Sequence, residues 1–349
     1  MKNMLITGGC GFIGSNFIRY LLKESDYTGR VINLDKLTYA GNPENLADVE
    51  IEYSNRYIFI QADICDGPRI FQIFEDYQID SVCHFAAESH VDRSIVQPDG
   101  FIQTNIVGTF NLLESARSRI GHMNRFHHIS TDEVYGSLGR EGYFTETTSY
   151  RPNSPYSASK ASSDHLVRAY HKTYGLPVSI SNCSNNYGPY QFPEKLIPLM
   201  ILNGIEGKSL PVYGDGQNVR DWLYVRDHCT AVWMIMKYGA NGETYNVGGS
   251  GEMENIKLVE MICDILDEVN PFPDLRSRRD LIAFVKDRPG HDLRYAIDSS
   301  KLKQALSWRP EVSLETGIRE TIDWYLQNRR WVDRIKSGEY QTWIKTHYR

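Results

Sequence analysis

The stretch that decides the fold is MLITGGCGFIGSNFIRYLL, residues 4–22. Its short apolar run predicts a buried strand at residues 3–7, and the pattern after it predicts a helix over residues 12–23. Gly8, Gly11 and Gly14 lie between them, in a GxxGxxG spacing that differs by one residue from GxGxxG. Glycines here let the backbone approach a pyrophosphate, which the free amides and positive end of a helix stabilise. The order of strand, glycine turn and helix therefore predicts a dinucleotide site, and a tight turn without ligand is the alternative.

Beyond this stretch, short β-branched runs alternate with helical segments. Strands are expected at residues 30–34, 57–61, 81–85, 125–130 and 177–182, and helices at residues 68–77, 99–119 and 155–174. This alternation predicts an α/β fold with a parallel, doubly wound Rossmann-type sheet. After Asn186 the pattern loosens into loops with helices near residues 194–204, 256–269 and 314–328, which predicts a smaller, mixed α/β C-terminal substrate lobe.

Composition excludes several classes of function. The 349 residues carry a net charge of -6, with both signs mixed along the chain, so we expect no nucleic-acid partner. No apolar run is long enough to span a bilayer and the N-terminus lacks the apolar segment of a signal peptide, so we expect no membrane partner and a cytoplasmic location. Cysteines without a CxxC pair argue against a disulfide framework or a zinc site. We expect no metal at His84, His90, His127 and His128 either, because no carboxylate or cysteine completes a cluster.

Asp35 ends the second strand, 21 residues after Gly14. A carboxylate at this position accepts hydrogen bonds from adenosine ribose hydroxyls and repels a 2′-phosphate, which predicts NAD rather than NADP. Lys36 would soften that repulsion. Asp63 and Ile64 end the third strand, where an adenine edge would lie, although an acid after a strand also caps turns.

Residues 130–160 concentrate groups that transfer protons. Tyr156 and Lys160 stand four apart, after Ser154 as N-cap and Pro155 as first helical residue, so both side chains should share one helix face. A cation one turn from a phenol, whose free pKa is about 10, favours phenolate and thus a base for a sugar hydroxyl. Without Tyr156 one turn earlier, Lys160 would be interpreted as a surface lysine of an amphipathic helix.

Asp132 and Glu133 follow directly at the end of the fifth strand. Successive strand residues point to opposite faces, so this pair can serve one pocket only if the backbone leaves the extended conformation there. The position favours a site, because ligand sites of α/β sheets open at the carboxyl ends of strands. The alternative is a pair of solvated carboxylates.

The chain resembles the extended short-chain dehydrogenase/reductase family through TGGCGFIG, Asp35, HFAAESHVD at residues 84–92, and Tyr156 with Lys160. Within that family it is similar to the dTDP-glucose 4,6-dehydratases through longer strings. These are LDKLTYAGN at 34–42, AAESHVDRSI at 86–95, STDEVYG at 130–136, NNYGPYQFPEKLIP at 185–198 and DRPGHDLRYAID at 287–298. The resemblance implies a lyase that converts dTDP-glucose to dTDP-4-keto-6-deoxyglucose and water with recycled NAD.

The resemblance also implies residue roles. Glu133 would be the base at C5, Asp132 the acid toward the C6 hydroxyl, and Thr131 and Tyr156 contacts of the C4 hydroxyl. The implied cofactor contacts are Gly8, Gly11, Phe12, Ile13, Gly14, Asp35, Lys36, Leu37, Thr38, Asp63, Ile64, Phe85, Ala86, Ala87, Thr104, Tyr156, Lys160 and Asn186. The implied substrate contacts are Ser89, Thr131, Asn185, Lys195, Leu196, Pro211, Tyr213, Arg220, Asn255, Asp287 and His291.

Two assignments combine charge or periodicity with this resemblance. Lys195 and Arg220 are candidates for a diphosphate, although either could be a surface ion-pair member. The helices at 99–119 and 155–174 leave an apolar stripe that predicts a homodimer, unless the second lobe covers it. We expect an NAD-binding domain of residues 1–185 with 220–250, and a nucleotide-sugar-binding lobe of residues 186–219 with 251–349.

Two other functions remain open from the sequence. A nucleotide-sugar 4-epimerase would use the same cofactor and Tyr/Lys pair but would leave Asp132 and Glu133 without a chemical task. An NAD-sensing module without catalysis would have no reason to keep both pairs.

Overall fold

A computed structural model describes residues 1–271, 275–287 and 292–338. Its main sheet is parallel, with strand order β10-β6-β5-β4-β1-β2-β3. The seven strands are β1 (Asn3–Thr7), β2 (Arg30–Asp35), β3 (Tyr57–Gln61), β4 (Ser81–His84), β5 (Arg125–Thr131), β6 (Val178–Cys183) and β10 (Thr244–Val247). The order reverses at the β1/β4 pair, which is the switch point where such sheets bind ligands. The predicted doubly wound α/β fold is confirmed.

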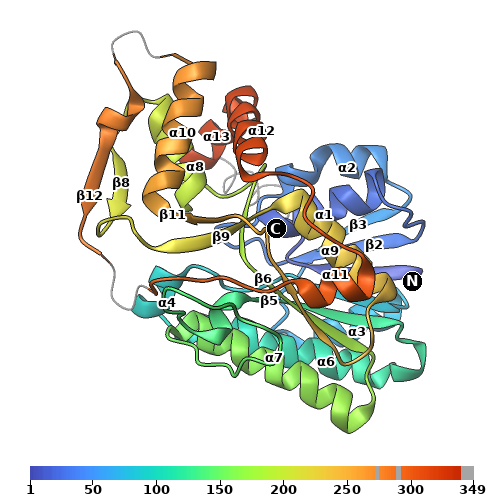
Figure 1. Cartoon of the computed structure of the whole chain (residues 1–349). Helices are drawn as coiled ribbons and strands as arrows, with labels where there is room; N and C mark the ends of the chain where they lie inside the picture. The colour runs from blue at the N-terminus through green and yellow to red at the C-terminus, as the bar shows by residue number, and fades with distance from the viewer. Residues whose placement is uncertain (272–274, 288–291, 339–349) are drawn as a thin grey trace.

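Helices cover both faces of this sheet because each presents an apolar stripe to it. One core lies under α3 (Gly67–Asp76), α6 (Thr109–Ser118) and α7 (Pro155–Tyr174). The other lies under α1 (Phe12–Lys23), the η1 turn (Pro43–Leu46), α2 (Ala47–Glu52) and α9 (Val225–Tyr238). In Figure 1, α6 and α7 lie on one side of the sheet and α1 and α9 on the other.

The expected helix over residues 99–119 is a composite. It begins as α5 (Asp99–Phe101), continues as the π-helical segment η2 (Ile102–Gly108) and becomes α6. Two short elements flank it, α4 (Val91–Val96) before and the 3-10 turn η3 (Ile120–His122) after. The π-helical segment carries Thr104 and Asn105 toward the loop that follows β4, where Asn105 Nδ2 donates to the Glu88 carbonyl oxygen at 3.0 Å.

The smaller lobe surrounds its own core, in which four helices pack together (Figure 1). These helices are α8 (Leu196–Ile205), α10 (Asn255–Val269), α12 (Leu314–Gln327) and α13 (Arg329–Ser337). Two small sheets accompany them, one of β7 (Asn185–Tyr187), β9 (Val219–Tyr224) and β11 (Glu252–Glu254), the other of β8 (Leu210–Tyr213) and β12 (Ile282–Val285). The 3-10 turn η5 (Arg278–Leu281) leads into β12.

The chain crosses between the lobes more than once. Helix α9 and β10 return to the main sheet, and α11 (Ser300–Leu306) packs with them through Leu302. Residues near 300 therefore contact the side of the molecule that we expected to bind NAD, and the domain boundaries stay a prediction. Within the described ranges, no helix has both the length and the apolar character that crossing a membrane requires.

Candidate active site

Two adjoining cavities open at the carboxyl ends of the main strands. The larger has a volume of about 300 Å³ and extends from the glycine turn to the ends of β5 and β6. The smaller, of about 110 Å³, lies beside the end of β2. Gly11, Ala40, Phe85 and Ala87 line both cavities, so they adjoin. Together they offer the long, two-part space that a dinucleotide requires.

The glycine turn leaves its backbone bare next to these cavities. Gly8 has a φ of +71°, and a Cβ there would lie 2.6 Å from the Ala86 nitrogen. A Cβ on Gly14 would lie 2.2 Å from the Gly8 carbonyl oxygen. Neither position thus admits a side chain. The turn ends at Gly11, the N-cap of α1, and Gly14 lies in the first turn of that helix. The first amides of that helix have no carbonyl partner within the helix, which suits a phosphate.

Asp35 lines the smaller cavity, and backbone amides fix its carboxylate. Its Oδ2 accepts from the Cys10 nitrogen at 2.9 Å and its Oδ1 from the Leu37 nitrogen at 2.8 Å. Lys36 forms an ion pair of 2.7 Å with Asp63 and so does not neutralise Asp35. A fixed carboxylate suits ribose hydroxyls and opposes a 2′-phosphate, so the residues present fit NAD.

The structure brings nearly all of the predicted cofactor residues to these two cavities. Leu37 is the exception, because it contributes its backbone amide to Asp35 and lines neither cavity. The predicted residues that do line a cavity are Gly8, Gly11, Phe12, Ile13, Gly14, Asp35, Lys36, Thr38, Asp63, Ile64, Phe85, Ala86, Ala87, Thr104, Tyr156, Lys160 and Asn186.

The acid pair lies where the backbone leaves the strand. Strand β5 ends at Thr131, and the 3-10 turn η4 (Asp132–Tyr135) begins at the next residue. The Thr131 hydroxyl caps this turn by accepting from the Glu133 nitrogen at 3.3 Å. As a result, Asp132 and Glu133 both line the larger cavity, which meets the condition set by the sequence. Burial raises the pKa of Asp132 well above its usual range, and the nearby Glu133 raises it further.

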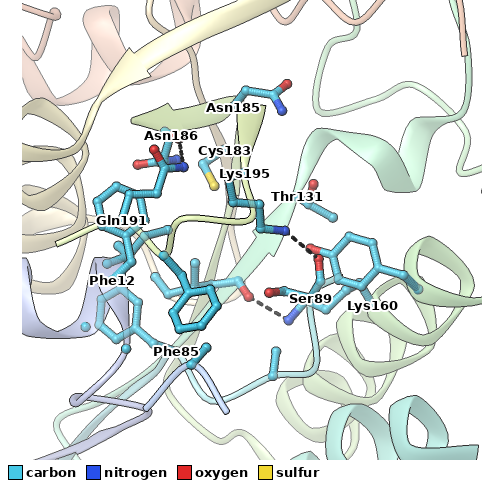
Figure 2. Close-up of a pocket in the computed structure, with 18 of the residues that line it drawn as sticks. Phe12, Phe85, Ser89, Thr131, Lys160, Cys183, Asn185, Asn186, Gln191 and Lys195 are labelled. Atoms are coloured by element: carbon cyan, nitrogen blue, oxygen red, sulfur yellow. Dashed lines mark hydrogen bonds between the residues drawn. The ribbon is translucent and has the colours of Figure 1, made fainter. Parts of the chain in front are cut away.

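Tyr156 and Lys160 enter the same cavity from α7. Ser154 caps the helix and forms a capping box with Ser157, so the predicted helix start is confirmed. The ammonium of Lys160 donates to the Ile129 carbonyl oxygen at 2.7 Å, and burial lowers the pKa of this lysine to about 8. Figure 2 shows Lys160 beside Thr131 at one side of the pocket.

The expected lowering of the Tyr156 pKa is wrong for the protein chain without a bound cofactor or substrate. The sequence predicted that Lys160 would lower the pKa of Tyr156, but burial raises the pKa of this phenol well above 10 and Glu133 raises it further. The reason is that the lysine ammonium is directed at Ile129 and His128 rather than at the phenol oxygen.

Four of the predicted substrate residues, Ser89, Thr131, Asn185 and Lys195, line the larger cavity. Lys195 Nζ donates to the Ser89 carbonyl oxygen at 3.3 Å, and both lie in the middle of the pocket in Figure 2. The cation expected near a diphosphate is thus held at the cavity by the loop that follows β4.

The remaining predicted substrate residues do not line this cavity. Leu196 begins α8, Pro211 and Tyr213 lie on β8, Asn255 begins α10, Asp287 lies beside Gly214, and Arg220 lies on β9. His291 lies outside the described residues. Arg220 is buried, donates to the Val219 and Asp292 carbonyl oxygens at 2.8 and 2.9 Å, and stacks over the Tyr295 ring. These hydrogen bonds hold the guanidinium against the backbone, so it does not point freely toward a diphosphate.

Sequence reasoning missed several lining residues. They are Tyr39, Ala40, Ile129, Ser130, Cys183, Ser184, Gln191, Phe192 and Glu194. Most could have been found, because they lie inside the strings that carry the resemblance or at the carboxyl ends of β5 and β6. Gln191 shows their use, since its Nε2 donates to the Asn186 carbonyl oxygen at 2.9 Å and so fixes a predicted cofactor contact.

The histidines of β5 point to opposite faces, as predicted. His127 contacts the Ser179 and Ser181 hydroxyls of β6, whereas His128 contacts Ser163 on α7. In the part of the chain that the structure describes, no group of three His, Cys, Asp or Glu residues has the arrangement of a metal site.

Comparison with known proteins agrees with this geometry. A family model described as GDP-mannose 4,6 dehydratase matches residues 5–321. The dTDP-glucose 4,6-dehydratase 1 of Escherichia coli K12 is 56% identical over 361 residues, which cover 99% of this chain and 98% of that protein. The crystal structure of a Bacillus anthracis dTDP-glucose 4,6-dehydratase in complex with NAD is 44% identical, with a TM-score of 0.86 and coverage of 96% and 100%.

An epimerase structure lies further away in sequence. The UDP-glucose 4-epimerase of Thermotoga maritima, solved with UDP-glucose, is 28% identical, with a TM-score of 0.83 and coverage of 94% and 99%. The fold is thus shared with epimerases, whereas the high identity is to dehydratases. This chain belongs to the GDP-mannose 4,6 dehydratase family, and its relatives from Escherichia coli K12 and Salmonella typhimurium, both more than half identical to it, are dTDP-glucose 4,6-dehydratases.

Proposed function

We propose that this protein is a lyase that converts dTDP-glucose to dTDP-4-keto-6-deoxyglucose and water with a recycled NAD. The observation that carries this proposal is the η4 turn, through which Asp132 and Glu133 line the cavity that also holds Tyr156 and Lys160. Identity above one half to curated dTDP-glucose 4,6-dehydratases supports the substrate, and a homologous NAD complex supports the cofactor.

The proposed reaction begins at C4 of the hexose. Tyr156 removes the C4 hydroxyl proton, Thr131 contacts the same hydroxyl, and Lys160 supplies a nearby positive charge and would contact the nicotinamide ribose of a bound cofactor. NAD, when bound, supplies the acceptor for the hydride that leaves C4 and the donor of the hydride that C6 receives. The glycine turn and Asp35 would hold the two halves of this cofactor.

Elimination follows from the acidity of the ketone. A C4 carbonyl acidifies the hydrogen on C5, so Glu133 can take that proton and return it to C5 when C6 receives the hydride. Asp132, whose pKa burial raises well above its usual range, gives a proton to the departing C6 oxygen. Two neighbouring acids with different surroundings thus take different roles: Asp132 is buried and Glu133 is half-buried.

The substrate diphosphate and base would occupy the side of the cavity nearest the smaller lobe. We propose Ser89, Asn185 and Lys195 as contacts there, because they line the cavity. The predicted residues on β8, β9 and α10 and Asp287 remain candidate nucleotide contacts on resemblance, and thymidine preference rests on the relatives alone.

An assay without added nicotinamide tests the proposal. The purified protein is incubated with dTDP-glucose labelled with ¹⁸O at C6. A 4-keto product that absorbs in alkali, with the label released as water, is the expected result. Label retained in a dTDP-sugar epimerised at C4 would favour an epimerase, and absence of any turnover with bound NAD intact would favour an NAD-sensing module.

We also propose a cytoplasmic homodimer. Apolar side chains remain exposed on the helices whose stripe predicted it, with Ile102 on η2 and Phe110 on α6 more than 40% exposed. Val96 on the neighbouring α4 is 86% exposed. Light scattering after size-exclusion chromatography should give a molar mass of twice the chain mass. For a Phe110→Asp variant, the measured mass should fall to that of a single chain.

A further inference from the structure

A line of buried polar side chains leads from Lys160 into the protein, away from the cavity. Lys160 Nζ lies 3.3 Å from His128 Nε2, and the same ring nitrogen lies 3.3 Å from Asp164 Oδ1. All three residues are at most 4% exposed. A lysine, a histidine and an aspartate thus meet without solvent between them.

Asp164 is held so that one oxygen faces this line. Its Oδ2 accepts from the Ser130 hydroxyl and the Tyr150 hydroxyl, both at 2.8 Å. Its Oδ1 accepts no hydrogen bond from the described residues and faces His128. A buried carboxylate is costly unless a positive charge compensates it. Arg168 reaches the Tyr150 oxygen rather than the carboxylate, so Lys160 is the cation along this line.

We propose that Asp164 is the buried counter-ion of Lys160 and, with His128 between them, a positioning residue that keeps the lysine ammonium charged and fixed beside the cavity. The inference rests on the function proposed above, in which Lys160 assists Tyr156.

The reaction gives this counter-ion a purpose. Tyr156 must begin each turnover as a phenolate, although burial raises its pKa. A positive charge one helical turn away, although it is directed at Ile129 and His128, offsets part of this effect of burial, and a neutral amine would not. Burial lowers the pKa of Lys160, and the charge of Asp164 raises it against that effect.

Other titratable groups surround the lysine and belong in any account of its pH dependence. They are Tyr156 on its own helix, His84 on β4, Cys183 at the end of β6, and Asp132 and Glu133 on η4. Burial lowers the pKa of His84 and of His128 well below the usual range, so neither ring carries a charge near pH 8. Asp164 is the carboxyl that faces Lys160 from the interior.

A pair of variants separates charge from hydrogen bonding. Asp164→Asn removes the charge but keeps an oxygen for the two hydroxyls, whereas Tyr150→Phe removes one of those hydrogen bonds and keeps the charge. The initial reduction of bound NAD by dTDP-glucose is followed at 340 nm between pH 6 and pH 10. For Asp164→Asn we expect a rate about 10- to 100-fold lower and an alkaline limb at least one pH unit lower. For Tyr150→Phe we expect a rate within about threefold of the parent and an unmoved limb. An unmoved limb in Asp164→Asn, or an equal shift in both variants, overturns the proposal.

A second measurement does not depend on activity. In protein labelled with ¹³C at lysine Cε, the Lys160 signal is identified by its loss in Lys160→Met and titrated with pH. Its midpoint should be lower in Asp164→Asn than in the parent and in Tyr150→Phe. Should Asp164→Asn fail to fold, the parent protein decides: the ¹³Cγ signal of Asp164 must change at the pH where Lys160 titrates, and an indifferent signal refutes the pair.

These outcomes are distinct from failure of the proposed function. A parent protein that neither reduces its NAD nor releases oxygen from C6 refutes the dehydratase reaction. In that case, the titration of Lys160 in the parent and in Asp164→Asn still tests whether Asp164 is the counter-ion of the lysine.

Discussion

Replacing Asp132 with asparagine should separate the two halves of the proposed reaction. The amide keeps the shape of a carboxyl group that is only 2% exposed, but it has no acidic proton to give to the C6 oxygen. Oxidation at C4 depends on Tyr156 and should proceed. Loss of a positioned general acid costs about 100- to 10,000-fold, so we expect that factor in product formation.

The same variant should be more stable than its parent at alkaline pH. Because the pKa of Asp132 is raised, the folded chain binds this proton more tightly than the unfolded chain. The pKa of this acid in the unfolded chain is roughly 4. Below that pH both states keep the proton, so the acid does not lower the free energy of unfolding. Each pH unit from there to the folded pKa favours the unfolded state by about 1.4 kcal/mol. Asparagine has no such cost, so the stability gain should vanish near pH 4 and grow as the pH rises above it.

Two assays check this prediction. Stopped-flow absorbance at 340 nm should show the parent-like appearance of reduced cofactor in Asp132→Asn, while alkali absorbance shows little 4-keto product. Urea unfolding of cofactor-free protein at pH 4, 6 and 8 gives the stability difference. Product formation within threefold of the parent, or a stability gain that does not grow with pH, would refute the assignment of Asp132 as a protonated acid.

Three other changes have defined outcomes. Glu133→Gln should let reduced cofactor appear at 340 nm but lower product formation at least 100-fold, and equal loss of both steps would contradict its role as base. Gly14→Ala places a methyl group 2.2 Å from a backbone oxygen, so the purified protein should lose its NAD, measured after acid release; Gly121→Ala, with no atom within 4 Å, is the control. Arg278→Met removes a fully buried guanidinium that donates to two backbone carbonyls and a carboxylate, so the free energy of unfolding should fall by about 3 to 5 kcal/mol. Arg279→Met, at an exposed ion pair, should cost less than about 1 kcal/mol in the same urea titration.

The first half of the fold could be predicted because its signals are local. The helices at 12–23 and 155–174 have the predicted bounds, since a glycine turn marks the start of one and a serine with proline marks the other. The seventh strand, β10, was missed. It has four residues and no alternation, and it exists because it pairs with β6, some 60 residues earlier. Helix α9 was missed for a similar reason, because its apolar face is defined by packing on α1.

The part of the site that lies at the ends of the main-sheet strands could be predicted from the sequence. Carboxyl ends of parallel strands meet at one edge, so Asp35, Thr131 and Asn185 converge although they are far apart in sequence. The contacts expected from the smaller lobe depend on how its short strands pair, and those pairings join distant segments. Strand β8 pairs with β12 and Arg220 is tied to the carbonyl of Asp292, neither of which a local pattern indicates.

The η4 turn explains why a dehydratase can be built from a fold that epimerases share. An epimerase returns the hydride to C4, so the tyrosine gives back the proton it took and needs no further acid. In the proposed reaction C4 remains a ketone, so Tyr156 ends with one proton more and Asp132 with one fewer. Both groups must be reset before the next turnover, and the Thr131 hydroxyl affects both, because it lowers the pKa of Tyr156 and lies 3.4 Å from Asp132 Oδ1. The residue that ends the strand and caps the turn thus connects the base of the first step to the acid of the second.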